Sequence, residues 1–396
     1  MSQGSRGVGA PELAALLERV HALGRDHVAP NAAAVDRDAR FPREAFAALK
    51  AEKLLSCYVP VEHGGMGLSI ADLSRVCEVL GQYCGSTAMV FAMHQIQVAC
   101  IVHHALGSAY FRAYVEEIVE KQLLLASATT ELGVGGDVRT SKCAVVVENG
   151  RYTLEKQAPV ISYGEAADAI MVTSRRAPDA GPNDQVHTLA RKGDYTLVPL
   201  SDWDTLGFRG TCSSGYTLRA SGAAEQVLPV PYAEIHAKTM HPFSHTTWSS
   251  LWVGIAGDAV NKARGFVRAE ARKTPGTLPP GALRLAELDG VLFTMRSGVT
   301  ATVAEYNRML AEGDDTAFES NFGFALQVNN LKVVSSQLII EVVSGALLIN
   351  GIAGYRNDSP HSLCRQLRDS YGAALMVNND RILGQSATMQ IVRRER

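Results

Sequence analysis

Hydrophobic residues recur at helical spacing through the first third of the chain and again through the last third. They fall every three or four positions from Pro11 to about Gln122 and from Trp248 to Arg272. Apolar residues with this period line one face of a helix, so both segments are predicted to be helical. Two more long helices are predicted over Leu283–Glu312 and Phe322–Asn350. Their wide apolar faces favour packing as a bundle, within one chain and across subunits.

The first helical segment is interrupted by the glycine-rich stretch Val59–Leu68 (VPVEHGGMGL). Glycines suit tight turns, and the Ser69 hydroxyl can cap a helix that begins near Ile70. We therefore expect four to six helices before Gln122.

Between about Leu123 and Tyr232 the pattern changes to short alternating or β-branched runs. Gly, Asn, Asp and Pro separate these runs at short intervals, which is typical of antiparallel strands joined by turns. The runs are Leu123–Thr129, Cys143–Val147, Tyr152–Leu154, Ile170–Ser174, Tyr195–Leu200, Tyr216–Arg219 and Gln226–Val230.

The order of helices, strands and helices predicts an α+β protein with three domains. We expect an N-terminal helical domain over residues 1–122, a central antiparallel β-barrel or sandwich over 123–235, and a C-terminal four-helix bundle over 236–396. The absence of a βαβ unit with a GxGxxG turn argues against a Rossmann site for a nicotinamide cofactor.

The composition narrows the class of ligand. Lys and Arg total 38 against 40 Asp and Glu, a net charge of -2, so there is no basic field to attract nucleic acid or an anionic membrane. Seven scattered cysteines without CxxC or Cys/His pairing indicate reduced core residues and no metal site. With no signal-like N-terminus and no apolar run of about 18 residues, we expect a cytoplasmic protein with a small-molecule substrate.

Four stretches resemble the signature stretches of acyl-CoA dehydrogenases, in the same order and at similar separations. They are Val59–Leu68, Ala128–Val138 (ATTELGVGGDV), Asp204–Ser213 (DTLGFRGTCS) and Gln366–Asp369 (QLRD). The resemblance covers nearly the whole chain. It implies the acyl-CoA dehydrogenase fold, a bound FAD with FMN as the alternative, and a homotetramer with a dimer as the alternative. The fold hosts dehydrogenases, oxidases and reduced-flavin monooxygenases, so it does not specify the reaction.

The same resemblance assigns candidate flavin contacts. Thr130 takes the place of a threonine that bonds the isoalloxazine edge, and Gly135 that of a glycine that lets the backbone approach the flavin. Ser162 takes the place of a threonine facing flavin N5, where a hydroxyl stabilises charge in the reduced ring. On their own, Thr130 and Ser162 would be interpreted as ordinary strand hydroxyls. The full set expected to bind the cofactor is Thr129, Thr130, Gly135, Gly136, Ile161, Ser162, Arg272 and Gly351.

Several positions depart from the family pattern. Val160 stands where dehydrogenases have a tryptophan against the flavin face, and Gly136 stands where the family has a serine. The arginine that the family places on the substrate side is absent, and the chain has His245 near that position. Arg272 is present where the family binds the adenine and pyrophosphate end of FAD. The glutamine- and glycine-containing stretch that the family also uses there is replaced by Leu348–Ile352 (LINGI). These changes weaken the expectation of tight FAD retention.

The catalytic glutamate of the dehydrogenases is missing. Dehydrogenation of an acyl thioester requires a carboxylate that removes the α-proton while hydride leaves to N5. The two segments where the family carries it read Ala374–Arg381 (ALMVNNDR) and Phe243–Thr247 (FSHTT). Asp380 would reach the site only if its turn were longer by one or two residues, and an Asp beside Arg381 is more often a helix cap or surface pair.

A neutral polar set takes the place of that base. His94, on an apolar helical stretch, is expected to line the substrate cavity with His245 and Ser162, although a lone histidine there is usually a satisfied core residue. In a dry cavity, reduced flavin and O₂ can form a C4a-hydroperoxide, and a neutral imidazole can accept the proton of the substrate. The predicted catalytic residues are His94, Ser162, His245 and Asp380.

Monooxygenases of this fold also lack the glutamate, and the chain resembles the nitrososynthases that oxidise the amino group of nucleotide-linked deoxyaminosugars. The first hypothesis is therefore a monooxygenase that uses O₂ and receives reduced flavin from a separate flavin reductase. The second is an acyl-thioester dehydrogenase that uses Asp380 or another carboxylate. The third is a catalytically inactive scaffold stabilised by flavin.

Overall fold

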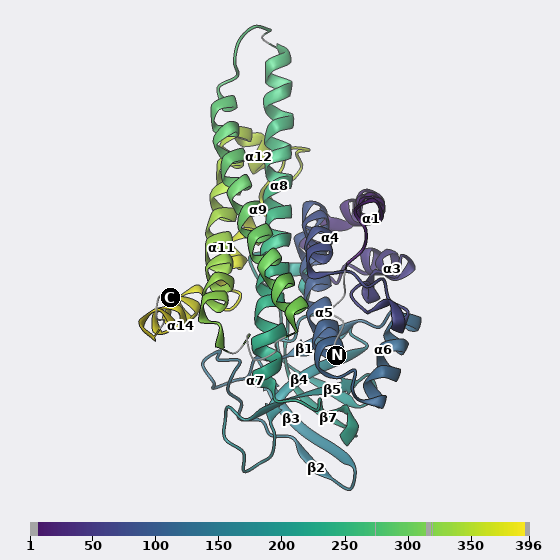
Figure 1. Ribbon diagram of the computed structural model, residues 1–396. Helices are drawn as coiled ribbons and strands as arrows, with labels where there is room; N and C mark the ends of the chain where they lie inside the picture. The colour runs from purple at the N-terminus through teal and green to yellow at the C-terminus, as the bar shows by residue number, and fades with distance from the viewer. Residues whose placement is uncertain (1–6, 274, 314–317, 319, 393–396) are drawn as a thin grey trace.

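Helices occupy both ends of the chain and strands its middle, as the hydrophobic pattern predicts. The computed structural model describes residues 7–273, 275–313, 318 and 320–392 of the 396-residue chain. In Figure 1 the N-terminal helices lie beside the lower half of three long C-terminal helices, and the strands lie beneath both. The fold is the acyl-CoA dehydrogenase-like arrangement expected from the sequence.

The N-terminal part consists of helices, of which the long α5 is almost wholly buried and packs against α4, α6 and α8 (His241–Lys273). The main helices are α1 (Ala10–Leu23), α2 (Ala29–Arg37), α3 (Arg43–Ala51), α4 (Ile70–Tyr83), α5 (Gly85–His104) and α6 (Ala109–Lys121). The predicted cap of α4 is present, because the Ser69 hydroxyl accepts from the Asp72 backbone N–H and the Asp72 carboxylate accepts from that of Ser69. α5 is as apolar as a membrane span, but 89% of its apolar window is buried within the protein.

Two small sheets form the middle of the chain. Their strands are β1 (Leu125–Ala128), β2 (Val146–Glu148), β3 (Arg151–Ala158), β4 (Ala169–Arg175), β5 (Gln185–Arg191), β6 (Tyr195–Ser201) and β7 (Gly215–Ala223). One sheet has the order β1-β4-β5 and the other β2-β3-β7-β6. The buried ammonium of Lys156 on β3 reaches across to Thr173 on β4, where it donates to the carbonyl and the hydroxyl at 2.6 and 2.9 Å.

Three details of this part differ from the sequence-based expectation. β1 pairs with β4 in parallel, because the chain passes through β2 and β3 of the other sheet before it returns. β5 was not predicted, since its polar residues obscure a strand that is buried on both sides. The predicted strand at Gln226–Val230 is instead a turn with one bridge, between Val227 and Thr188.

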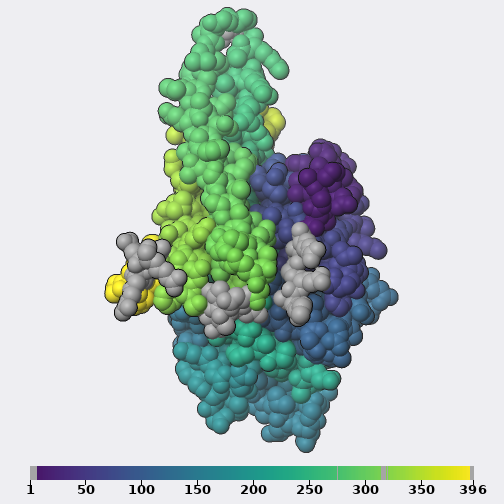
Figure 2. Space-filling view, in the orientation of Figure 1, coloured from purple at the N-terminus to yellow at the C-terminus, as the bar shows by residue number. Residues whose placement is uncertain are grey.

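Three long helices, α8 (His241–Lys273), α9 (Gly281–Glu312) and α11 (Phe322–Asn350), run side by side in the C-terminal part (Figure 1). The shorter α13 (Cys364–Leu375) packs against α11 and α8, and α12 (Ile352–Tyr355) and α14 (Asn379–Val392) complete this part. Figure 2 shows the far ends of α8 and α9 projecting beyond the body of the molecule.

The N-terminal and C-terminal helices meet backbone to backbone where α4 crosses α8. A β-carbon on Gly81 of α4 would lie 2.3 Å from the Leu251 carbonyl oxygen, and one on Gly254 of α8 would lie 2.1 Å from that of Glu78. Only glycine permits so close an approach of two helices. This contact fixes the position of α8, whose first turns line the cavity described below.

A second contact joins all three parts of the chain. The Arg368 guanidinium pairs with the carboxylate of Asp36, at the end of α2. The buried carboxylate of Asp369 accepts a hydrogen bond of 2.6 Å from the Phe208 backbone N–H, in the loop between β6 and β7. Gly207 lets that loop approach, since a β-carbon there would lie 2.3 Å from the Arg368 carbonyl oxygen. We call this contact the Arg368–Asp369 clamp.

Replacement of Gly254 by alanine should destabilise the protein, because the new methyl group overlaps the Glu78 carbonyl. We expect Gly254→Ala to lower the free energy of unfolding by about 1–3 kcal/mol, measured by urea denaturation. Gly257→Ala is the matched control. It lies on the same helix with nothing within 4 Å of its β-carbon, so it should be neutral or slightly stabilising. Equal stability of the two variants would contradict the close crossing.

Loss of the Asp369 carboxylate should loosen the joint between α13 and the β6–β7 loop. Asp369→Ala leaves the buried Phe208 N–H without its acceptor, and we expect a loss of about 1–3 kcal/mol in unfolding free energy. Asp369→Asn keeps an acceptor oxygen of the same shape and should lose less. The contact would be unimportant if both variants denatured at the same urea concentration as the unmodified protein.

Candidate active site

A cavity of about 460 Å³ lies where the three parts of the chain meet. It is lined by α5, by the segment after β1, by the β6–β7 loop, by the first turns of α8, and by the turn between α13 and α14. Apolar side chains such as Met89, Met93 and Ile96 cover the α5 side. The wall contains one acidic residue among those the structure describes, Asp137, and its carboxylate lies 3.5 Å from the Arg139 guanidinium.

Several of the residues predicted to bind flavin lie together on this wall. Thr129, Thr130, Gly136 and Ser162 all line the cavity. The Thr130 hydroxyl donates to the Val160 carbonyl at 3.1 Å, and Val160 itself lines the cavity where the dehydrogenases have tryptophan. The segment after β1 and the segment after β3 therefore converge as the resemblance implies.

The hydroxyl of Ser162 is the end of a short chain of hydroxyls. Ser213 donates to Ser162 over 2.8 Å, and Thr211 lies 2.7 Å from Ser213. Because Ser213 donates to Ser162, the Ser162 hydroxyl keeps its own proton for a ligand in the cavity, while Thr211 donates to the Phe208 carbonyl at 2.8 Å. The site therefore offers a neutral hydrogen-bond donor at the position predicted to face flavin N5.

The remaining predicted cofactor residues lie outside the cavity wall. The Gly135 carbonyl accepts from the Arg381 guanidinium at its edge, and Ile161 is buried with its N–H donated to Ser214. Arg272 lies 27 residues after His245 on the same helix, which is about 40 Å at 1.5 Å per residue. Gly351 lies between α11 and α12, and Figure 1 shows α12 in the upper part of the bundle, away from the strands. Contact of Arg272 and Gly351 with a flavin in this cavity would require a neighbouring subunit.

The prediction that His94 lines the cavity is wrong. The ring is completely buried, its Nε2 lies 2.7 Å from the Leu55 carbonyl oxygen, and its Nδ1 accepts from the Leu125 N–H at 3.0 Å. Both nitrogens are thus used to join α5 to the backbone of two other segments. Burial lowers the pKa of His94 to about 4, so the ring is neutral and satisfied.

The prediction that Asp380 reaches the site is also wrong. Asp380 is exposed in the first turn of α14, where a negative charge favours the helix N-terminus, and its N–H donates to the Asn378 side chain at 2.8 Å. The next residues, Arg381 and Ile382, line the cavity instead. The turn does not have the extra length that a catalytic Asp380 would need.

His245 does line the cavity, together with two histidines that the sequence analysis missed. The ring centroids of His236 and His241 are 5.6 Å apart in a stacked arrangement, and those of His241 and His245 are 4.6 Å apart at right angles. Burial is the main cause that lowers the pKa of His236 to about 3, that of His241 to about 4, and that of His245 well below its usual value. All three are neutral at neutral pH.

A π-helical turn explains why this cluster was missed. Residues 236–240 form a π-helix that leads directly into α8. In a regular α-helix, residues five apart lie on different faces, whereas π-helical hydrogen bonds join residues five apart. His236 and His241 therefore share a face that α-helical periodicity does not reveal. Such turns are frequent at functional sites.

Polar atoms without partners point to a ligand with hydrogen-bonding groups. Both ring nitrogens of His245 and the indole nitrogen of Trp248 are buried and have no hydrogen-bond partner in the protein. Leaving such a group unsatisfied costs about 1–3 kcal/mol, which a bound ligand can offset. A flavin fits this donor and acceptor set, because its ring is planar and carries acceptors and one donor along its pyrimidine edge.

Three guanidinium groups give the cavity a positive character. Arg139 pairs with Asp137, Arg368 with Asp36, and Arg381 donates to the Gly135 carbonyl. Against these three cations, Asp137 is the one acid on the described wall. Arginine is well suited to bind phosphate oxygens, so the cavity fits a phosphate-bearing ligand.

A buried lysine holds the turn that carries Met376 and Val377 into the cavity. Lys332 on α11 is completely buried and donates to the Val377 carbonyl at 3.0 Å and to the Asn379 side chain at 2.7 Å. Burial lowers the pKa of Lys332 to about 7. No sequence pattern indicates this role, because Lys332 stands alone in a broadly apolar helix.

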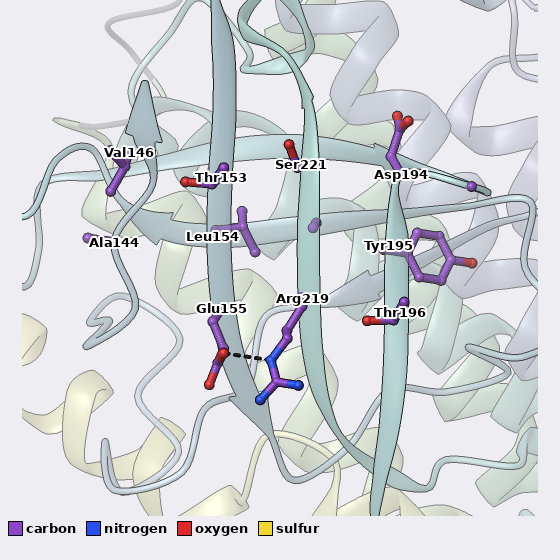
Figure 3. A pocket seen from close by; sticks show the side chains of 12 residues that line it. Ala144, Val146, Thr153, Leu154, Glu155, Asp194, Tyr195, Thr196, Arg219 and Ser221 are labelled. Carbon is purple, nitrogen blue, oxygen red and sulfur yellow. Dashed lines mark hydrogen bonds and ion pairs between the residues drawn. The ribbon is translucent and has the colours of Figure 1, made fainter. Parts of the chain in front are cut away.

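A second hollow, of about 490 Å³, lies over the four-stranded sheet. Figure 3 shows Glu155 and Arg219 pointing towards each other there, at 2.7 Å, so their charges are matched. It contains no histidine or cysteine, and it does not adjoin the cavity described above. In the described part of the chain, His, Cys, Asp and Glu form no group able to hold a metal ion.

Comparisons with known proteins agree with the fold. Residues 10–121 match the family described as acyl-CoA dehydrogenase, N-terminal domain. Cyclohex-1-ene-1-carbonyl-CoA dehydrogenase from Geobacter metallireducens is 26% identical over 89% of this chain and 91% of its own. The amino sugar nitrososynthase DnmZ from Streptomyces peucetius is 22% identical over 86% of this chain and 84% of its own.

Among solved structures, FMN-bound TdsC from Paenibacillus sp. A11-2, a dibenzothiophene monooxygenase, superposes with a TM-score of 0.83. It is 19% identical, and the match covers 96% of this chain and 98% of TdsC. Residues 10–121 therefore match the N-terminal domain of acyl-CoA dehydrogenases, and the chain as a whole has the fold of these flavin-dependent oxidoreductases and is similar to them in sequence.

Proposed function

We propose that the protein is a flavin-dependent monooxygenase that uses reduced flavin and O₂ to oxidise an amino group, such as that of a nucleotide-linked aminosugar. One observation carries this proposal, namely that the cavity has no free carboxylate. Asp137 is paired with Arg139, and no glutamate lies on the described wall. An acyl-thioester dehydrogenase needs such a base, whereas a monooxygenase does not.

The side chains on the wall support oxygen chemistry. A bound reduced flavin would supply two electrons to O₂. The apolar wall of Met89, Met93 and Ile96 excludes water, and the Ser162 hydroxyl can donate to the ring. The neutral histidines accept or donate protons without a fixed positive charge that would repel the protonated form of an incoming amine.

The positive character of the cavity supports a substrate with a phosphate group. Arg139, Arg368 and Arg381 are near enough to the cavity to contact phosphate oxygens of a flavin or of a nucleotide-linked substrate. The similarity to DnmZ, an amino sugar nitrososynthase, suggests which of the phosphate-bearing amines to test first.

The proposal includes a separate flavin reductase, because the sequence has no nicotinamide-binding fingerprint. The flavin is FAD or FMN, and the adenosine end of FAD would need Arg272 and Gly351 of a neighbouring subunit. Exposed apolar side chains on α11, including Val334 and Leu348, favour a homotetramer. Seven free cysteines favour the reducing cytoplasm.

The direct test combines the purified chain, a flavin reductase, NADH, FMN or FAD, and a panel of nucleotide-linked aminosugars under ¹⁸O₂. We expect the label to appear on the nitrogen of at least one product, detected by mass spectrometry. Catalase and an anaerobic reaction serve as controls for free peroxide, and the matching 3-hydroxy sugars serve as substrates without the amine. Absence of labelled product from every amine would contradict the proposal.

The alternative, an acyl-thioester dehydrogenase, is favoured by the similarity to the Geobacter enzyme over 89% of the chain. It predicts that an acyl-CoA bleaches the oxidised flavin under anaerobic conditions. If so, Asp137→Asn should abolish the bleaching, because Asp137 is the one acid on the described cavity wall. Our proposal predicts no bleaching by any member of an acyl-CoA panel.

A further inference from the structure

His241 differs from the other histidines near the cavity in how its ring is held. Its Nε2 lies 2.8 Å from the Asn329 amide oxygen, and the Asn329 amide nitrogen donates to the Ser386 hydroxyl at 3.0 Å. Asn329 is 2% exposed, on α11, and Ser386 is on α14. Three helices that are distant in the sequence thus fix the orientation of one imidazole.

This arrangement leaves the other nitrogen of His241 available. With Asn329 as acceptor, Nε2 carries the proton and Nδ1 keeps a lone pair. The His241 side chain lines the cavity, and no described residue makes a hydrogen bond to Nδ1. A proton acceptor requires this combination of one nitrogen held by an orienting group and one nitrogen free.

The neighbouring histidines lack the combination. Both nitrogens of His94 are occupied by backbone groups, and neither nitrogen of His245 has a partner. His236 stacks on His241 but makes no hydrogen bond to a described residue. Among the described histidines of the wall, His241 alone has a fixed ring and a free nitrogen.

The charges around His241 keep the ring neutral. The groups that face it are His236 on the preceding π-helix, His245 one turn further along α8, and Arg139 from the segment after β1. Burial and the Arg139 charge outweigh the Asn329 hydrogen bond, so the pKa of His241 falls to about 4. The one acid on the described wall, Asp137, is already paired with Arg139.

We propose that Nδ1 of His241 accepts the proton that leaves the substrate nitrogen during its oxidation, and that Asn329, supported by Ser386, is the residue that positions it. This rests on the proposed monooxygenase function. Overall, reduced flavin, O₂ and R–NH₂ give oxidised flavin, R–NHOH and water.

Within that reaction the nitrogen lone pair forms the N–O bond while the O–O bond breaks. The electron pair of the O–O bond goes to the oxygen that becomes water, and the nitrogen is left positively charged. One N–H bond then breaks, its electron pair stays on nitrogen, and the proton binds Nδ1. The new imidazolium is stabilised by the Nε2–H bond to Asn329. A weak base suffices, because attachment of oxygen makes the N–H far more acidic.

The kinetic test uses His241→Gln, which keeps size and polarity but cannot accept a full proton. We expect kcat for labelled product to fall about 10²–10⁴-fold with little change in KM. Oxidation of reduced flavin should continue with release of peroxide, and added imidazole should partly rescue a His241→Gly variant. Product formation by His241→Gln at the unmodified rate would overturn the proposal.

Asn329 variants test the positioning role. Asn329→Leu should lower kcat at least tenfold. Its circular dichroism spectrum should stay unchanged, which shows that the variant is folded. Asn329→Asp keeps the acceptor and adds a charge that stabilises the imidazolium, so it should lose much less kcat than the Leu variant and move the acidic limb of the pH profile from about pH 4 to a higher value. An unshifted limb in the Asp variant, or full activity in the Leu variant, would contradict the assignment.

A spectroscopic readout separates this proposal from the proposed function. In ¹⁵N NMR of histidine-labelled protein without substrate, His241→Gln identifies the His241 signals. Between pH 5 and pH 8 we expect a protonated Nε2 and a bare Nδ1, and Asn329→Leu should abolish this single tautomer. A protonated Nδ1 in the unmodified protein would overturn the proposal even if the enzyme proves to be a monooxygenase.

Discussion

The Arg368–Asp369 clamp is the contact on which the arrangement of the site depends. It joins Asp36 of the N-terminal helices and Phe208 of the β6–β7 loop to two adjacent residues of α13. Because the cavity lies between these three parts, this contact helps to hold its walls at their observed spacing. The backbone contact of α4 with α8 adds a second constraint, since it fixes the helix that carries the three histidines.

Two features determine the chemistry that this cavity can support: its histidines are buried, and its described wall has no free carboxylate. Removal of water lowers the pKa of the wall histidines, and no free acid is present on the described wall to counter that effect. The imidazoles are therefore neutral, and their hydrogen bonds, not their charges, determine what each can do. The arginines of the wall and the buried Lys332 hold loops in place, as Arg381 does through the Gly135 carbonyl and Lys332 through the Val377 carbonyl.

The sequence predicted much of the fold because the relevant signals are local. Helical periodicity located α8, α9 and α11, and Ser69 located the start of α4. The wall positions Thr130, Gly136, Ser162 and His245 followed from short stretches similar to a known family. Where a signal was hidden, the prediction failed. β5 is buried on both sides and carries polar residues, so it has no alternation to detect.

The sequence by itself determined that the chain lacks the catalytic glutamate of acyl-CoA dehydrogenases, because the residues at the two segments where the family carries it can be read directly. It did not distinguish His94 from His241, since both are histidines on helices of the core. The tertiary structure decided between them. Backbone groups of Leu55 and Leu125 occupy both nitrogens of His94, whereas Asn329 holds only one nitrogen of His241. An imidazole's role depends on which partners reach its two nitrogens, and those partners come from segments far away in the sequence.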